Sequence, residues 1–210
     1  MEFITKGNNL YQEGKLEEAI ASYDEAISHN PEDLKAYVAK GVALEKTGKY
    51  EEAIDCYDKA ISLDPDSADF YNKKGLALSE IGKCGEAVDC FDKAISLDPN
   101  HTKVYCNKAI ALNEIGKHQE AVDCCDKAIS LDPNDADLYN NKGISLHAMG
   151  KYEEAVHCYD KAISLEAEGP GAYVAYLNKC YAFEQIGKYE AGKLEEAIGC
   201  LTKANSLYPY

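Results

Sequence analysis

The sequence lacks a long apolar segment, an apolar leader and any excess of positive charge. No apolar run approaches the roughly 18–20 residues that a membrane-spanning helix needs, so membrane insertion is not expected. Residues 1–15 contain no apolar region of the kind found at the centre of a secretory signal, which favours a cytoplasmic protein. The formal net charge is −15, and a surface this acidic repels nucleic acid and anionic lipid. The expected partner is therefore a protein or peptide that is neutral or basic.

Motifs that carry catalysis or hold a metal ion are also missing. None of the five histidines has another histidine or cysteine three or four residues away, so no helix presents a pair of zinc ligands. The sequence shows no glycine-rich phosphate loop and no nucleophile elbow. We therefore predict a protein without catalytic residues, metal or cofactor, and not an enzyme.

The nine cysteines include no Cys-x-x-Cys pair, and several of them recur every 34 residues, at Cys56, Cys90, Cys124 and Cys158. A ladder of thiols could in principle bind a soft metal. Packed helices lie about 8–10 Å apart, however, whereas each sulfur must approach zinc to about 2.3 Å. We interpret these cysteines as reduced thiols that fill small, partly buried spaces.

An internal repeat organises the whole chain. The phrase Gly-Lys-x-x-Glu-Ala-Ile/Val recurs at a step of 34 residues, and a second phrase, YDKAISLDP, recurs with variations in step with it. The first phrase begins at Gly14, Gly48, Gly82, Gly116, Gly150 and, after an irregular step, Gly192. Such a period is typical of stacked helical repeats, each of which buries its apolar face against the next.

Each repeat is expected to form two helices. In the second repeat, the apolar spacing predicts a helix A over about 34–47 and a helix B over about 50–63. Gly48 suits the left-handed position that ends helix A, and Pro65 cannot continue helix B. We expect Gly41 to let the two helices approach closely while Tyr57 fills the space beside it.

These positions resemble the tetratricopeptide repeat family, whose small-Gly, Ala, Tyr/Phe, Ala and Pro pattern the chain shows in six copies. The resemblance implies an all-α fold, a right-handed superhelical solenoid of antiparallel helix pairs, forming a single domain over 1–210. The expected repeats are approximately 1–33, 34–67, 68–101, 102–135, 136–169 and 173–210, with insertions near 170–172 and 187–191.

Two features depart from the regular pattern. A lysine precedes the helix-A glycine position in every repeat, at Lys6, Lys40, Lys74, Lys108, Lys142 and Lys179, where the family often has leucine. We expect it to lay its stem on apolar surface, and not to form a site. In the last repeat, the extra residues near 187–191 lengthen helix A or, alternatively, form a loop after Gly187; we favour the longer helix.

The resemblance implies a scaffold or adaptor whose inner helices hold an extended peptide of a partner protein. Asparagines and apolar residues recur at the inner positions, and an amide can both donate to and accept from a peptide backbone. The alternative is that these asparagines are merely solvated. The candidate groove residues are Asn72, Lys73, Leu76, Lys103, Asn107, Ile110, Asn140, Asn141, Ile144, Asn178 and Tyr181.

One binding mode of the family is not expected. Its co-chaperone members grip a C-terminal carboxylate with lysines, asparagines and an arginine. Here Ile4, Ala39 and Asp69 stand where that clamp has lysine, asparagine and lysine, although Asn8 matches one clamp asparagine. We predict no tight binding of acidic C-terminal tails.

The last repeat places Asn205 where the earlier repeats have isoleucine, which fits an edge exposed to water. This C-terminal edge could support a weak homodimer. Two alternatives to the adaptor therefore stay open, namely a homo-oligomerising assembly unit and an exported bacterial effector or regulator that uses the same repeat surface.

Overall fold

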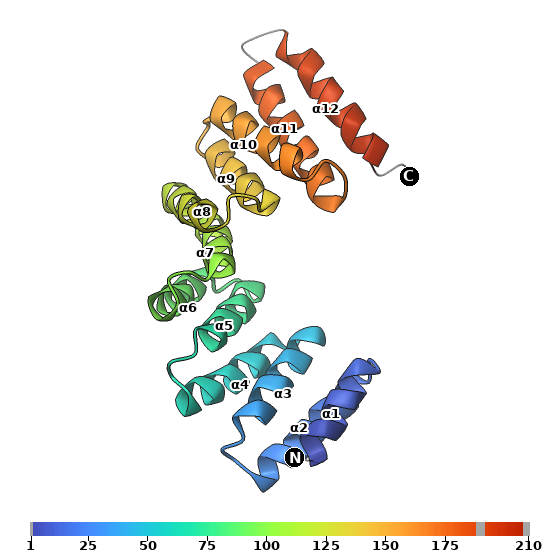
Figure 1. The fold of residues 1–210 in the computed structure, drawn as a ribbon, viewed down its shortest axis with the longest axis vertical. Helices are drawn as coiled ribbons and strands as arrows, with labels where there is room; N and C mark the ends of the chain where they lie inside the picture. Colours follow the sequence, from blue (N-terminus) through green and yellow to red (C-terminus); the bar gives the residue numbers. More distant parts are fainter. Residues whose placement is uncertain (1, 188–191, 208–210) are drawn as a thin grey trace. The chain divides into compact units, whose positions relative to one another are not determined.

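The computed structural model of the chain describes residues 2–187 and 192–207. Every regular element in these ranges is an α-helix, as predicted. The chain divides into two compact units, Met1–Val104 and Tyr105–Tyr210, and helices adjacent in sequence pack as pairs within each unit (Figure 1).

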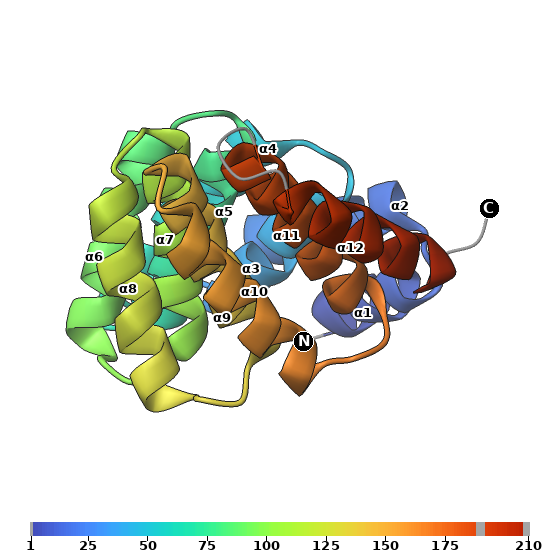
Figure 2. The same cartoon turned by 90° about the horizontal axis from the view of Figure 1, so that it is seen from above.

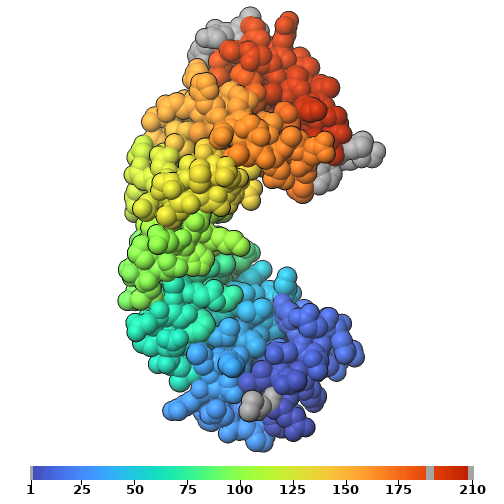
Figure 3. All heavy atoms as spheres, in the orientation of Figure 1, coloured from blue at the N-terminus to red at the C-terminus, as the bar shows by residue number. Residues whose placement is uncertain are grey.

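The first unit contains six helices, which are α1 (Glu2–Gln12), α2 (Leu16–His29), α3 (Leu34–Lys46), α4 (Tyr50–Leu63), α5 (Ala68–Glu80) and α6 (Cys84–Leu97). Those of the second unit are α7 (Thr102–Glu114), which begins just before the division, α8 (His118–Leu131), α9 (Ala136–Ala148), α10 (Tyr152–Leu165), α11 (Pro170–Gly187) and α12 (Lys193–Leu207). Side chains fill the spaces between consecutive helices in each unit (Figure 3).

The turn from helix A to helix B is built as the sequence predicts. Gly48 has a φ of 75°, a left-handed conformation that favours glycine. Its backbone N–H donates to the carbonyl of Glu45, and the N–H of Lys49 donates to the carbonyl of Leu44 at 2.9 Å. These bonds satisfy the last carbonyls of α3. The same left-handed glycine recurs at Gly14, Gly82, Gly116 and Gly150.

The core of each repeat lies where an aromatic ring of helix B covers a glycine of helix A. A Cβ atom added to Gly41 would lie 2.7 Å from Cε1 of Tyr57, which is fully buried. Glycine is therefore required at this position by the ring packed on it, and the predicted close approach is confirmed. Gly75 and Phe91 make the same contact between α5 and α6.

The recurring lysine has a role that the sequence analysis missed, because it forms an ion pair with the preceding repeat. Its ammonium contacts an aspartate of the previous helix B in the pairs Lys40–Asp24, Lys74–Asp58, Lys142–Asp126 and Lys179–Asp160, at 2.5–2.6 Å. Burial lowers the pKa of Lys142, but the hydrogen bond and the charge of Asp126 outweigh it, so the pKa is raised. Each such pair links one repeat to the next.

The sixth repeat begins its helix A early. The other A helices from α3 to α9 have 13 residues, whereas α11 has 18 and starts at Pro170, inside the first predicted insertion. The described helix ends at Gly187. The preference for a longer helix through the second insertion falls on residues 188–191, which lie outside the described residues.

Over the ranges that the structure covers, no helix has the length and apolarity needed to cross a bilayer.

Candidate peptide-binding face

Three A helices of the second unit place predicted site residues on a common face. Asn141 and Asn178 occupy equivalent positions on α9 and α11, and Asn107 occupies that position on α7. One turn later, the equivalent residues are apolar, namely Ile110, Ile144 and Tyr181. Since α9 packs on α11 and hydrogen bonds join α7 to α9, these residues form two adjacent rows. We call them the asparagine row and the apolar row.

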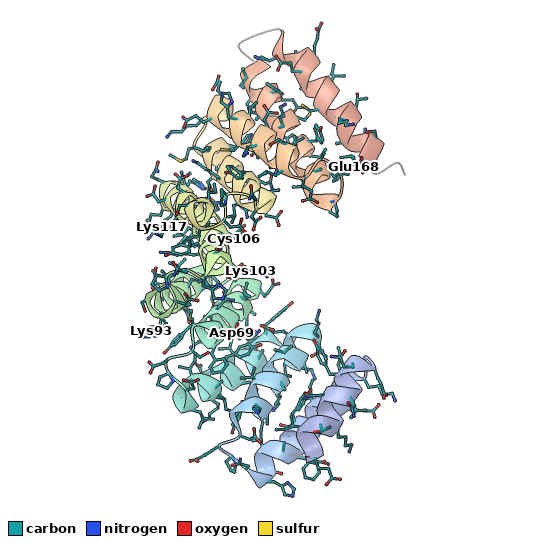
Figure 4. The ribbon with its side chains drawn as sticks, in the orientation of Figure 1. Asp69, Lys93, Lys103, Cys106, Lys117 and Glu168 are labelled. Carbon is teal, nitrogen blue, oxygen red and sulfur yellow. The ribbon has the colours of Figure 1, made fainter. Side chains whose placement is uncertain are left out.

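The asparagine row is tied to its own scaffold. Nδ2 of Asn141 donates to Sγ of Cys106 on α7, and Nδ2 of Asn178 donates to Oδ1 of Asn140 on α9, both at 3.1 Å (Figure 4 labels Cys106). In both cases the acceptor lies one residue before the equivalent position of the previous repeat. An amide has a second N–H and a carbonyl oxygen, so each can still meet a peptide backbone. These asparagines therefore join adjacent repeats, and simple solvation does not describe them.

A second polar network lies behind this face. Nδ2 of Asn113 donates to Oγ of Ser145 at 2.8 Å, and Ser145 donates to the carbonyl of Asn141. His118 contacts Oδ1 of Asn113 through Nδ1 at 3.1 Å. Ser145 is fully buried, so its partners satisfy a hydroxyl that would otherwise be destabilising. The signal that could have revealed this network is the serine itself, because equivalent positions such as Ala111 carry alanine.

The apolar row is open to solvent. Tyr181 is 53% exposed, and Ile110 and Ile144 are also among the exposed large apolar side chains. Grouped exposed apolar residues on a soluble protein mark surfaces that bind a partner. This row is the part of the predicted site with the clearest capacity to bury area on binding.

Most charges beside the two rows are negative, although Lys103 on α7 occupies the position that Asp137 has on α9. Glu114, Asp137 and Glu184 are exposed on α7, α9 and α11. His147 on α9 occupies the position that Glu184 has on α11, and its ring lies 5.1 Å from that of Tyr152. Burial lowers the pKa of His147, while a hydrogen bond with the Tyr181 backbone works in the opposite direction, so the imidazole is neutral at pH 7. The carboxylates therefore outnumber the positive charges beside the two rows.

The predicted residues of the first unit differ in accessibility. Leu76 is exposed on α5, whereas Asn72 is buried. Nζ of Lys73 lies 3.9 Å from Oδ2 of Asp69. Burial raises the pKa of Glu45, and the charge of Lys73 partly counteracts this. Lys73 thus interacts with the carboxylates of Asp69 and Glu45.

Two further observations bear on anion binding. Lys103 is exposed in the first turn of α7 (Figure 4). Asn8, which matches an asparagine of the carboxylate clamp, accepts a hydrogen bond from the Tyr23 hydroxyl at 2.9 Å. The absence of a carboxylate clamp rests on Ile4, Ala39 and Asp69 in the sequence and stays a prediction.

The cysteines are free thiols, and Cys56, Cys124 and Cys200 are buried. Burial raises the pKa of Cys56 to about 11, so its thiol is protonated and unreactive at neutral pH. Over the described parts of the chain, no group of three or more histidine, cysteine or acidic side chains is arranged to hold a metal ion.

Comparisons with known proteins agree on the architecture. The solved structure of MamA is 25% identical with a TM-score of 0.73, covering 77% of this chain and 94% of that chain. YrrB, described as a TPR protein with an unusual peptide-binding site, is 26% identical with a TM-score of 0.69, covering 81% and 88%. PilF from Pseudomonas aeruginosa is 21% identical with a TM-score of 0.76, covering 99% and 91%.

Sequence comparisons identify the repeat itself. No curated protein matches the chain significantly. Three family models described as tetratricopeptide repeat match it, over residues 4–68, 56–89, 102–135 and 136–168. With the helix pairs, the left-handed glycines and the glycine–aromatic packing described above, these matches establish that the chain belongs to the tetratricopeptide repeat family.

Proposed function

We propose that this protein is a non-enzymatic interaction scaffold, and that the asparagine and apolar rows of α7, α9 and α11 hold an extended peptide of a partner protein. The observation that carries the proposal is the exposed apolar row beside amides fixed by hydrogen bonds. The likeness to YrrB, described as having a peptide-binding site, supports it.

The spacing of the repeats suits an extended ligand. Packed helices lie about 8–10 Å apart, and a strand rises about 3.3 Å per residue, so each repeat meets about every third residue of the peptide. Asn107, Asn141 and Asn178 would bond the peptide backbone, and the apolar row would receive every third side chain. Since one hydrogen bond contributes about 0.5–1.5 kcal/mol and micromolar affinity needs about 8 kcal/mol, apolar contacts must supply much of the binding energy.

The ligand preferred by this face has apolar residues at every third position and lysine or arginine between them. Glu114, Asp137 and Glu184 repel an acidic peptide and attract a basic one. The chain as a whole adds to this preference through its net charge of −15.

We expect Ile144→Asp and Tyr181→Ser to weaken peptide binding about tenfold or more, because each removes an apolar side chain from the row. The probes are fluorescein-labelled peptides of about twelve residues, with leucine at every third position and either lysine or glutamate between. Fluorescence anisotropy measures their affinity at low and physiological salt.

The matched control is Ile198→Asp, which places the same charge on an exposed isoleucine of α12, away from the face. Circular dichroism checks that each variant keeps its helices. If neither peptide binds the unmodified chain, or if Ile144→Asp and Tyr181→Ser bind as well as the control, the proposal is wrong. Substitutions at Asn141 or Asn178 are less selective tests, because these residues also join adjacent repeats.

A further inference from the structure

The outer side of α12 carries an apolar row that stays largely exposed, although its first residue, Leu194, also packs against Gly187 of α11. Leu194, Ile198 and Leu201 are all exposed, and Ile198 is 64% exposed. Val156, the equivalent residue on α10, is only 9% exposed because it packs in the core formed with α11. Both cartoon views show α12 at the edge of the second unit, beside α11 (Figures 1 and 2).

This finding corrects the expectation drawn from Asn205. The asparagine is exposed, as expected, but the edge to which it belongs is mainly apolar. Ala197, Cys200 and Ala204 of the same helix are buried. The apolar surface of α12 is therefore wider than contact with α11 requires.

The residue types and their spacing define what this edge fits. Leu194, Ile198, Leu201 and Asn205 follow one another at steps of four, three and four, which is the alternation of d and a positions in a heptad. Leucine at d with isoleucine at a favours a two-stranded coiled coil, and one asparagine at an a position sets the register. We propose that α12 pairs in parallel with α12 of a second copy of this chain.

The parallel arrangement follows from the asparagine. In a parallel pair, each residue of the row meets its own counterpart, so the two Asn205 amides can bond each other. An antiparallel pair would place Asn205 against Leu194 and leave a buried amide without a partner, which is destabilising.

A head-to-tail contact is less suited to this row. In α1, the apolar side chains of Phe3, Ile4 and Leu10 are half-buried. No large apolar side chain described in α1 is as exposed as Leu194, Ile198 or Leu201 of α12. Pairing of α12 with itself matches apolar surface with apolar surface by two-fold symmetry.

The row is short, but α12 is already folded against α11, so pairing does not have to nucleate a helix. The charged residues Glu195, Glu196 and Lys203 lie outside the row. The main opposing force is the net charge of −15 on each copy, and added salt screens this repulsion. The dimer should therefore be weak at low salt and stronger at physiological or higher salt.

The test is analytical ultracentrifugation of the full chain over a concentration series, at low and high salt. We expect dimer formation that strengthens with salt. Ile198→Asp should weaken it about tenfold or more, because two carboxylates would face each other in the pair. Asn205→Ile should strengthen it about tenfold, because an apolar a position replaces a polar one.

The control is Ile144→Asp, which lies on the peptide-binding face and should leave the dimer unchanged. A chain that stays monomeric up to about 1 mM at high salt overturns the proposal, as does a dimer that Ile198→Asp leaves intact. If Ile198→Asp dissociates the dimer but Asn205→Ile does not strengthen it, Asn205 lies outside the contact and the proposed heptad register is wrong. Retention of peptide binding by Ile198→Asp separates this result from the outcome for the peptide-binding face.

Discussion

Replacing Gly75 with alanine should destabilise the first unit by about 1–3 kcal/mol, the usual effect of overpacking a core. A Cβ atom at this position would lie 2.6 Å from Cε1 of Phe91 and 2.9 Å from two further ring atoms. Phe91 of α6 is fully buried where α6 packs on α5, so relieving the clash requires the buried ring or the two helices to shift. The helix propensity gained by alanine, about 1 kcal/mol, opposes this loss but does not remove the clash.

The chain itself contains the compensating pair. In the fourth repeat, the equivalent positions are Ala109 and Cys125, both fully buried. A larger residue on helix A is thus matched by a smaller residue on helix B. Phe91→Cys alone should cost about 3 kcal/mol or more, because it leaves a cavity. The double variant of Gly75→Ala and Phe91→Cys should lose less than the sum of the two single changes, by about 0.5–3 kcal/mol.

Urea unfolding followed by circular dichroism measures this cycle. The slope of unfolding free energy against urea concentration must be compared among the unmodified chain, the two single variants and the double variant. An array of repeats can unfold in more than one step, and a changed slope would reveal this. Additive effects of Gly75→Ala and Phe91→Cys would contradict the proposed packing, because they would mean that the two positions do not interact.

The helices themselves could be predicted from local patterns. The expected helix over 34–47 is α3, Leu34–Lys46, and the expected helix over 50–63 is α4, Tyr50–Leu63. The helix ends depend on single residues with known backbone preferences, such as Gly48. These preferences do not depend on tertiary contacts, so they can be recognised from the sequence. The glycine–aromatic contact was also accessible, because Gly41 and Tyr57 recur together in register.

Contacts between repeats were harder to predict. The Lys142–Asp126 ion pair and the Asn141–Cys106 hydrogen bond join neighbouring repeats, and they depend on the exact shift of one helix pair against the next. A repeating sequence shows which residues recur but not which recurring positions meet. For the same reason, Asn205 alone suggested a polar edge, whereas the exposure of Ile198 required the packing of α12 to be known.

The fold should lose stability steeply above about pH 10, because buried groups keep their protons in the folded chain and release them in the unfolded chain. Burial raises the pKa of Tyr57 and Tyr159, and that of Cys125. The folded state therefore binds more protons than the unfolded state at alkaline pH, so the free energy of unfolding falls as pH rises. The raised pKa of Lys142 acts in the same direction, since its ion pair is lost when the ammonium finally deprotonates.

The share of the tyrosines can be isolated by substitution with phenylalanine. Phe91 stands at the equivalent position of the third repeat, so Tyr57→Phe and Tyr159→Phe introduce a residue that the repeat already accommodates. Above pH 10, each substitution should reduce the slope of unfolding free energy against pH by up to about 1.4 kcal/mol per pH unit. Tyr181→Phe is the matched control, because that side chain is exposed and its environment changes little on unfolding. Urea unfolding at pH 8 to 11 gives the slopes; equal slopes for Tyr159→Phe and the control would show that the buried hydroxyl ionises without unfolding the repeat.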